Sequence, residues 1–483
     1  MIAIQNELVE WMSVRKDMST RSYASSCAIR SAFSAAMSAM YRTEVPAYGT
    51  LMDIVATVNA ETLAADPTLK RRLQETDTLE RVSEERHGAI RLGTAAELAM
   101  MRRVFAVMGM YPVGYYDLSE AGVPVHSTAF RPVGDAALKR NPFRVFTSLL
   151  RLDLIADEGL RAQAEAILQE RQIFTAGAIE LTQKAERQGG LDDGDAKRFV
   201  AEALETFRWH DQANVDLAMY KRLHDAHRLI ADVVSFKGPH INHLTPRTLD
   251  IDQVQRLMPE HGIAPKAVVE GPPSRRCAIL LRQTSFKALE EAVSFKDANG
   301  NWHKGTHTAR FGEIESRGIA LTPKGRALYD KLLTDSRKAV RPEADGSNAA
   351  AYETALANAF VPFPDDWAEI RAQGLGYFRY WLTEKGNSAV AAAESSVDQL
   401  VADGLVGFDP IVYEDFLPVS AAGIFQSNLG DEAAQKFTAS PNQQRFERDL
   451  GTAVLDEFDH YAGIEAQSIA HCRARLSAVE AAE

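Results

Sequence analysis

A histidine and an arginine lie four residues apart at positions 87 and 91, with the small residues Gly88 and Ala89 between them. This spacing places His87 and Arg91 on the same face of either a strand or a helix. An imidazole can bind Fe, Zn, Cu or Ni, and a guanidinium can hold a carboxylate through two parallel hydrogen bonds. The pair could therefore hold a metal ion and an acidic ligand together. The alternative is a core histidine beside an arginine that pairs with a nearby glutamate, such as Glu85 or Glu97.

A second histidine and a glutamate farther along the chain would complete a metal site. His243 lies in an extended segment with prolines on both sides, and Glu313 lies on a predicted strand whose inward-facing acids would need a partner. Two histidines and one carboxylate with open coordination positions form the facial triad of non-haem Fe(II) oxygenases. A Zn or Mn site with the same ligands would have the same sequence pattern. The residue types predict a metalloenzyme but do not select the metal.

The residue types also leave the choice of ligands open. Glu315 shares a strand face with Glu313 and could replace it as the carboxylate ligand. Several other histidines could take the place of His87 or His243: His210, His224, His227, His240, His303 and His307.

The composition of the 483-residue chain is that of an ordinary globular protein, with 46% hydrophobic and 25% charged residues. The formal net charge of -12 argues against a general nucleic-acid binder, whose affinity depends on clustered Lys and Arg. No run of eighteen apolar residues predicts a membrane span, and the N-terminus lacks the apolar region of a signal peptide. Cys27, Cys277 and Cys472 show no CxxC spacing, so we expect a reducing cytoplasm.

The elements around the two histidines follow the same order. The strand that carries His87 precedes a helix that begins at a Thr94–Glu97 capping box, and two short strands follow. The segment that carries His243 leads into a helix over residues 251–258, and further strands and an Asn-Gly hairpin follow. This order predicts two copies of one strand-helix-strand unit, with the histidines in equivalent positions.

The pattern as a whole predicts an α+β fold with a β-sheet core, large helical insertions and a helical C-terminal region. The expected divisions are a poorly constrained leader (1–26), N-terminal helices with the first unit (27–141), a helical insert (142–234), the second unit (235–322) and a mostly helical C-terminal region (323–483). A loop at residues 414–425 has small residues after a proline, which leaves backbone N–H groups accessible to a carboxylate.

Five motifs, in order along the chain, resemble the 2-oxoadipate dioxygenase/decarboxylase family. They are Arg86-His87-Gly88-Ala89-Ile90-Arg91, Gly114-Tyr115-Tyr116-Asp117-Leu118, Gly238-Pro239-His240-Ile241-Asn242-His243-Leu244-Thr245-Pro246-Arg247, Phe311-Gly312-Glu313-Ile314-Glu315 and Pro418-Val419-Ser420-Ala421-Ala422-Gly423-Ile424-Phe425. The likeness runs from about residue 33 to about residue 461.

The resemblance implies a vicinal-oxygen-chelate-like sheet core, related in plan to hydroxymandelate synthase, that binds one Fe(II). The family's ligands fall on His87, His243 and Glu313, its substrate arginine falls on Arg91, and its backbone substrate contacts fall on Val419 and Ser420. The implied reaction converts 2-oxoadipate and O2 to D-2-hydroxyglutarate and CO2 in lysine catabolism.

Two other functions are weighed against this one: a Zn- or Mn-dependent isomerase or hydrolase of a small oxo acid, and a binding protein without turnover. A requirement for O2 would distinguish the dioxygenase from the isomerase or hydrolase. The inward-facing Glu313 argues against a protein that only binds a carboxylate, because such a site favours positive charge. The sequence does not predict the oligomeric state.

Overall fold

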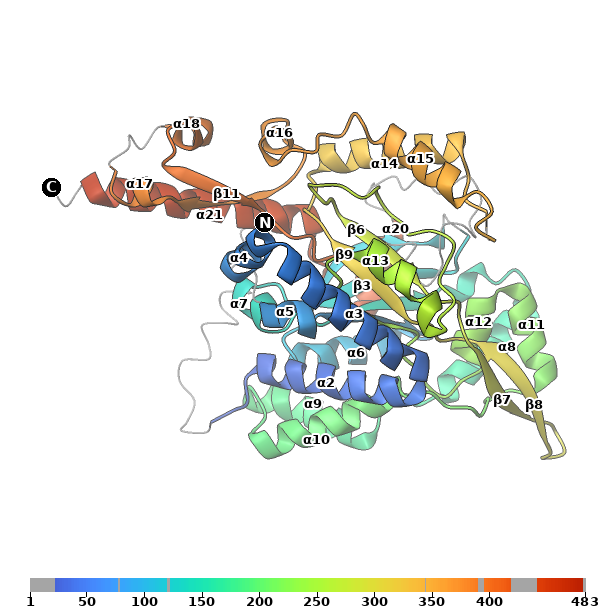
Figure 1. Ribbon diagram of the computed structural model, residues 1–483. Helices are drawn as coiled ribbons and strands as arrows, with labels where there is room; N and C mark the ends of the chain where they lie inside the picture. Colours follow the sequence, from blue (N-terminus) through green and yellow to red (C-terminus); the bar gives the residue numbers. More distant parts are fainter. Residues whose placement is uncertain are drawn as a thin grey trace.

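The structure is a computed structural model that describes residues 22–76, 79–119, 122–343, 345–389, 395–417 and 441–480. A central β-sheet is surrounded by many helices, which confirms the predicted α+β class (Figure 1). Of the predicted leader, only residues 22–26 are described. Val419 and Ser420 lie outside the described residues, so the substrate contacts predicted for them stay predictions. Among the described helices, none has the length and apolar character needed to cross a membrane.

The strands are β1 (Arg86–Leu92), β2 (Tyr111–Asp117), β3 (Val125–Arg131), β4 (Arg144–Leu150), β5 (Leu244–Pro246), β6 (Leu281–Ser285), β7 (Glu290–Lys296), β8 (Trp302–Thr308), β9 (Glu313–Arg317), β10 (Phe378–Leu382) and β11 (Val406–Pro410). The α-helices are α2 (Ser26–Glu44), α3 (Pro46–Ala65), α4 (Pro67–Thr76), α5 (Leu79–Glu84), α6 (Ala95–Val107), α7 (Asp135–Arg140), α8 (Glu158–Glu170), α9 (Ala176–Gln188), α10 (Asp193–Leu204), α11 (Leu217–Ala226), α12 (Arg228–Val234), α13 (Ile251–Leu257), α14 (Pro323–Ala339), α15 (Ala349–Ala359), α16 (Trp367–Ala372), α17 (Glu384–Asn387), α18 (Val397–Ala402), α20 (Pro441–Leu450) and α21 (Glu457–Glu480).

The first unit of the sheet is built from β1, α6, β2, β3 and β4. The strand order in the sheet is β2-β3-β4-β1-β5, with β1 parallel to β4 and antiparallel to β5. The helix between β1 and β2 begins where predicted, because the Thr94 hydroxyl accepts from the Glu97 backbone and the Glu97 side chain accepts from the Thr94 backbone.

The second unit follows the same order with β5, α13, β6 and β9. Strand β9 pairs with β6, and it meets the end of β5 in a parallel bridge between Arg247 and Glu315, where the Thr248 N–H donates to the Glu315 carbonyl at 2.8 Å. In both units the last strand therefore runs parallel to the first, which supports the predicted repeat. Because β1 and β5 are antiparallel neighbours, the first strands of the two units meet in the middle.

The predicted helical insert over residues 142–234 is wrong at its start, where β4 occupies Arg144–Leu150. All seven residues of β4 are buried, so the strand lacks the alternation of polar and apolar residues that marks a half-exposed strand. A short, fully buried strand cannot be distinguished from a buried helix by periodicity alone. Helices α8 to α12 follow it, as expected for this segment.

The Asn-Gly hairpin forms β7 and β8, which project from the body of the molecule (Figure 1). Gly300 in its turn has a φ of 87°, a conformation that favours glycine. The chain then leaves the hairpin, and β9 begins at Glu313 in a separate pairing with β6. The hairpin thus separates β6 from β9 in sequence without separating them in space.

Candidate metal centre and active site

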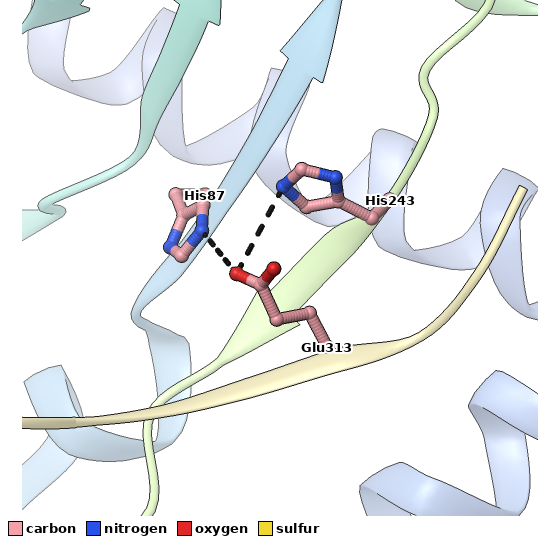
Figure 2. A group of neighbouring side chains, drawn as sticks. All are labelled: His87, His243 and Glu313. Carbon is pink, nitrogen blue, oxygen red and sulfur yellow. Dashed lines mark hydrogen bonds and ion pairs between the residues drawn. The ribbon is translucent and has the colours of Figure 1, made fainter. Parts of the chain in front are cut away.

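His87, His243 and Glu313 converge in the interior of the protein (Figure 2). One oxygen of Glu313, Oε1, lies 3.1 Å from His87 Nε2 and 4.0 Å from His243 Nε2. The three potential ligand atoms all lie within 4.8 Å of one another, and the three side chains have no exposed surface. Strands β1 and β9 supply His87 and Glu313, and His243 immediately precedes β5. The arrangement is a three-ligand site that can hold one metal ion.

The hydrogen bonding of these side chains fits a bound cation. Within the described part of the chain, both ring nitrogens of His243 and the Oε2 atom of Glu313 lack a hydrogen-bond partner although they are buried. A buried polar atom without a partner costs about 1–3 kcal/mol. A metal ion between the two rings and the carboxylate would give one ring nitrogen of His243 and the Glu313 carboxylate a charged partner.

Burial also prepares the ligands for a metal. It lowers the pKa of both His87 and His243, in the case of His243 well below the usual 6.5, so both rings are neutral near pH 7 and can bind a cation. Burial raises the pKa of Glu313 above 4.5, so its negative charge is costly until a cation is present. Lys266, whose pKa burial lowers to about 7, provides positive charge near Glu313 that the sequence did not indicate.

Close backbone contacts hold the three ligand segments together. A Cβ atom at Gly88 would lie 2.7 Å from the His243 carbonyl oxygen, so β1 can approach this segment only with glycine next to His87. The Tyr41 hydroxyl lies 3.0 Å from the Asn242 carbonyl oxygen and 2.8 Å from the Phe311 carbonyl oxygen. Tyr41 therefore ties the segment of His243 to the segment of Glu313.

Glu315, the alternative carboxylate ligand, faces arginines instead of the other two candidates. Its Oε1 atom lies 2.6 Å from Arg144 Nη2 and 2.5 Å from Arg317 Nη2, and all three side chains are buried. The same oxygen lies 3.2 Å from His87 Nδ1, on the side of the ring opposite Glu313. This contact places negative charge beside the ring, but His87 Nδ1 makes no hydrogen bond in the described structure. The geometry thus favours Glu313 as the ligand and Glu315 as a charged neighbour of His87 that pairs with the arginines.

Glu315 belongs to a larger buried network of charges. Glu85 lies at 3.0 Å from Arg144 and 3.2 Å from Arg247. Burial opposes the ionisation of Glu85, but Arg247, Arg144 and Arg81 together lower its pKa to about 2. Four arginines contact three carboxylates in this network: Arg81, Arg144, Arg247 and Arg317 with Glu85, Glu315 and Glu414. The network fixes the strand ends that carry the metal ligands.

The start of the predicted substrate loop is anchored beside the metal ligands. Asp415 forms two hydrogen bonds with the buried Arg131, at 2.6 and 3.0 Å, and accepts a third from the Tyr461 hydroxyl at 2.6 Å. The next residue, Phe416, is fully buried, and its ring lies 4.9 Å from the His87 ring in an edge-to-face contact. Phe416 therefore forms an apolar wall against one candidate metal ligand, a role that the sequence around it did not indicate.

Arg91 lies on the same strand as His87, and its guanidinium is paired with a residue that the sequence did not indicate. Arg91 Nη1 lies 2.6 Å from Asp232 Oδ2, on α12. The glutamates suggested as its partners are engaged elsewhere, Glu85 in the arginine network and Glu97 with Arg171 at 2.7 Å. The positive charge of Arg91 helps to lower the pKa of His243, after burial and His87, so the guanidinium lies near this ring.

The alternative histidines do not join the metal cluster in the described structure. His240 and His307 contact Asp232, at 3.4 and 2.9 Å, and His303 pairs with Asp297 in the exposed hairpin. The candidate ligand set that the structure brings together is thus the set carried over from the resemblance.

Comparison with known proteins gives one consistent family. A family model described as 2-oxoadipate dioxygenase/decarboxylase matches residues 33–428. A protein of that name from Pseudomonas putida is 57% identical over 462 residues, which cover 95% of this chain and 99% of the relative. One from Escherichia coli is 56% identical over 446 residues, which cover 92% and 97% of the two chains. A crystal structure of the hydroxyglutarate synthase from Pseudomonas putida in complex with 2-oxoadipate matches with a TM-score of 0.87 and 57% identity, over 95% of this chain and all of that one.

Proposed function

We propose, since this chain belongs to the 2-oxoadipate dioxygenase/decarboxylase family, that it converts 2-oxoadipate and O2 to D-2-hydroxyglutarate and CO2, with Fe(II) held by His87, His243 and Glu313. The observation that carries the metal assignment is the convergence of the three buried side chains around one point. The reaction is balanced without another reductant. The carboxylate next to the oxo group leaves as CO2, and both atoms of O2 enter the shortened hydroxy acid.

The metal is proposed to be iron because the reaction uses O2. Two histidines and one carboxylate with open positions are the ligand set of non-haem Fe(II) oxygenases. When bound, Fe(II) would supply open coordination positions and the redox chemistry that O2 requires. The neutral state of His87 and His243 supports this role, because protons do not compete with the metal for the rings near pH 7.

Arg91 is proposed to bind the carboxylate at the far end of 2-oxoadipate. A guanidinium presents a planar pair of donors that matches a carboxylate, and contact at the far end would set the distance between Arg91 and the reacting carbon. A substrate of the wrong length would lose the orientation that this contact provides. The backbone of Val419 and Ser420 is proposed to make further substrate contacts, on the basis of the family resemblance.

Aromatic rings next to the ligands would keep water out of the site. The Phe416 ring lies 4.9 Å from the His87 ring, and the Phe311 ring lies 4.7 Å from the His243 ring. An apolar surrounding strengthens the electrostatic interactions among charged groups and protects reactive species from side reactions. The three cysteines form no disulfide, which suits the cytoplasmic location that we propose for this step of lysine catabolism.

Oxygen consumption tests the proposal directly. The metal-free protein is reloaded anaerobically with Fe(II) and mixed with 2-oxoadipate in an oxygen electrode, and CO2 and 2-hydroxyglutarate are quantified. We expect one O2 consumed for each molecule of the two products. His87→Gln should abolish uptake, while the matched control His303→Gln, at an exposed histidine of the hairpin, should leave it unchanged.

The result that would contradict the proposal is unaltered 2-oxoadipate with no oxygen uptake. The same protein loaded with Zn(II) or Mn(II) is assayed in parallel. Turnover of an oxo acid by these forms without O2 would favour an isomerase or hydrolase. Binding of 2-oxoadipate with no turnover under any metal would favour a binding protein.

A further inference from the structure

Asp232 is a buried carboxylate whose two oxygens are both engaged. It lies on α12 and is 6% exposed. Its Oδ2 atom lies 2.6 Å from Arg91 Nη1, and its Oδ1 atom accepts from His307 Nε2 at 2.9 Å. His240 Nε2 lies 3.4 Å from the same Oδ1 atom. One side chain thus connects the strand of Arg91, the hairpin strand β8 and the segment that leads to His243.

The orientation of Asp232 is fixed in turn by His307 and Tyr220. The Tyr220 hydroxyl on α11 lies 2.8 Å from His307 Nδ1, and the other ring nitrogen faces Asp232. If Tyr220 donates to Nδ1, the neutral ring carries its proton on Nε2 and donates it to the carboxylate. Tyr220, His307, Asp232 and Arg91 then form one continuous chain of hydrogen bonds.

Aromatic side chains enclose this chain of hydrogen bonds. The Trp209 ring lies 4.7 Å from the His240 ring and stacks on the His307 ring at 6.3 Å. The Phe236 ring lies 4.8 Å from the His307 ring. This packing restricts the motion of the His240 and His307 rings, so little further conformational entropy is lost when they hold Asp232 in place. The surroundings therefore make Asp232 a rigid support for the arginine.

Asp232 carries a negative charge in this setting. Burial by itself would raise its pKa, but the guanidinium of Arg91 and the nearby His240 and His307 rings hold that pKa well below 3.8. The contact between Arg91 and Asp232 is therefore a charge-assisted hydrogen bond, which is shorter and stronger than one between neutral groups. Such a bond holds one nitrogen of the guanidinium, Nη1, beside Asp232.

We propose that Asp232 is a positioning residue, which directs the Arg91 guanidinium toward the substrate and thereby determines the preference for an oxo acid with a second carboxylate. This inference rests on the proposed function, because it assumes that Arg91 binds the far carboxylate. Asp232 and Tyr220 both come from the helical segment after β4, so the inference also gives that segment a role in the site. Without Asp232 the guanidinium can rotate, and the far carboxylate would be held at the wrong distance from the reacting carbon.

The test compares two substrates that differ only at the far end. 2-Oxoadipate has the second carboxylate, and 2-oxohexanoate has a methyl group there. For Asp232→Asn we expect kcat/KM for 2-oxoadipate to fall about tenfold or more, the range for losing a hydrogen bond to a charged group, while kcat/KM for 2-oxohexanoate changes less than about twofold. Iron content should equal that of the parent protein. The matched control is Asp225→Asn, at an exposed aspartate of α11.

A purely structural role for Asp232 would give a different result. In that case both substrates would lose kcat/KM by the same factor, and the proposal would be overturned. Unchanged kcat/KM values for both substrates would overturn it as well. If Asp232→Asn does not fold, Tyr220→Phe carries the test, since it removes only the far hydroxyl of the chain. The ratio should then fall about threefold, a fraction of the full contact, and no change would count against the proposal.

Equilibrium binding separates this inference from the proposed function. The Fe(II)-loaded protein is titrated anaerobically with each oxo acid, so no turnover is needed. If the parent protein binds 2-oxoadipate more tightly than 2-oxohexanoate but does not consume O2, the proposed reaction is wrong while the role of Asp232 can still be read from the affinity ratio. If the parent protein shows no preference between the two acids, the role of Asp232 is refuted whether or not O2 is consumed.

Discussion

Replacing Glu313 and Glu315, one at a time, by glutamine should produce opposite effects on metal content and stability. The two residues lie two positions apart on β9, and both are fully buried. Their partners differ in charge. Glu313 contacts the neutral groups His87 Nε2, Thr245 Oγ1 and Gln283 Nε2, at 3.1 to 3.2 Å, whereas Glu315 contacts two arginines.

For Glu313→Gln we expect loss of the metal and no loss of stability in the metal-free protein. Burial raises the pKa of Glu313 above its unfolded value of 4.5, so the folded state favours the protonated acid. The stabilisation that protonation of Glu313 gives the folded state is therefore present below the unfolded pKa of 4.5, and it is lost as the pH rises through the higher pKa of the folded state. Each unit of such a shift corresponds to about 1.4 kcal/mol. Glutamine stays neutral at every pH, so the metal-free variant should be as stable as the parent at pH 7.5, or more stable.

For Glu315→Gln we expect the reverse. Burial raises the pKa of Glu315 to about 8, but the contacts of its Oε1 atom with Arg144 and Arg317 favour the carboxylate. Without that carboxylate both arginines would keep their charges in the interior, and removing one partner of a buried ion pair costs about 3–5 kcal/mol. The metal ligands themselves would remain. Loss of a group that supports a metal-binding histidine typically weakens metal affinity by about 10–100-fold. The variant should therefore still bind iron stoichiometrically when Fe(II) is in excess.

Two measurements on each variant decide the outcome. Iron per chain is determined after anaerobic loading with excess Fe(II), and the free energy of unfolding is determined in urea with a chelator present. Glu353→Gln, at an exposed glutamate of α15, is the matched control and should change neither quantity. Full iron content in Glu313→Gln together with an iron-free but stable Glu315→Gln would refute the reasoning and assign Glu315 as the ligand.

Three further predictions concern other parts of the molecule. Arg91→Ala should lower kcat/KM for 2-oxoadipate by about 10–150-fold without lowering iron content, because a hydrogen bond to a charged group contributes about 1.5–3 kcal/mol; a change within about threefold in steady-state assays would contradict its role. Acidification from pH 7 to 5 should lower the free energy of unfolding of the parent protein by about 2 kcal/mol more than that of His126→Gln, because burial lowers the pKa of His126 from 6.5 to about 4 and the unfolded chain takes up the proton first. Equal pH dependence of the two proteins in urea unfolding would contradict this. Removing the metal with a chelator should lower the free energy of unfolding by about 2.7 kcal/mol relative to protein at a free Fe(II) concentration of 100 Kd, and an unchanged unfolding curve would argue against a site that binds only the folded state.

Local patterns in the sequence were sufficient for the elements that position His87 and Arg91. A strand places residues 87, 89 and 91 on one face, and the capping box at Thr94 marks where the next helix begins. These features depend on residues within a few positions of one another, so the sequence expresses them directly. The similar order of elements after each histidine likewise predicted the paired units that meet at β1 and β5.

The partners of the site residues could not be predicted in the same way. His87 meets Glu313 across 226 positions, and Arg91 meets Asp232 across 141. Such pairs depend on which strands and helices become neighbours, and the periodicity of one segment contains no information about that. Asp232 is one of 66 Asp and Glu residues in the chain, and its burial against Arg91 distinguishes it. The same reasoning applies to β4, whose complete burial removed the alternation that would have identified it.

The difference between the two units accounts for the single carboxylate of the proposed ligand set. In the first unit, the residue of β4 that pairs with His87 in the register is Arg144, and in the second unit the residue of β9 that bridges to Arg247 is Glu315. The last strands thus carry opposite charges where they approach the middle of the sheet, and Arg144 and Glu315 form an ion pair at 2.6 Å. Two identical units would place like charges there, which repel in a buried setting. Because β9 is the acidic strand of the pair, it can supply Glu313 to the proposed metal site and Glu315 to the arginines from alternate positions, while the first unit contributes His87 and Arg91.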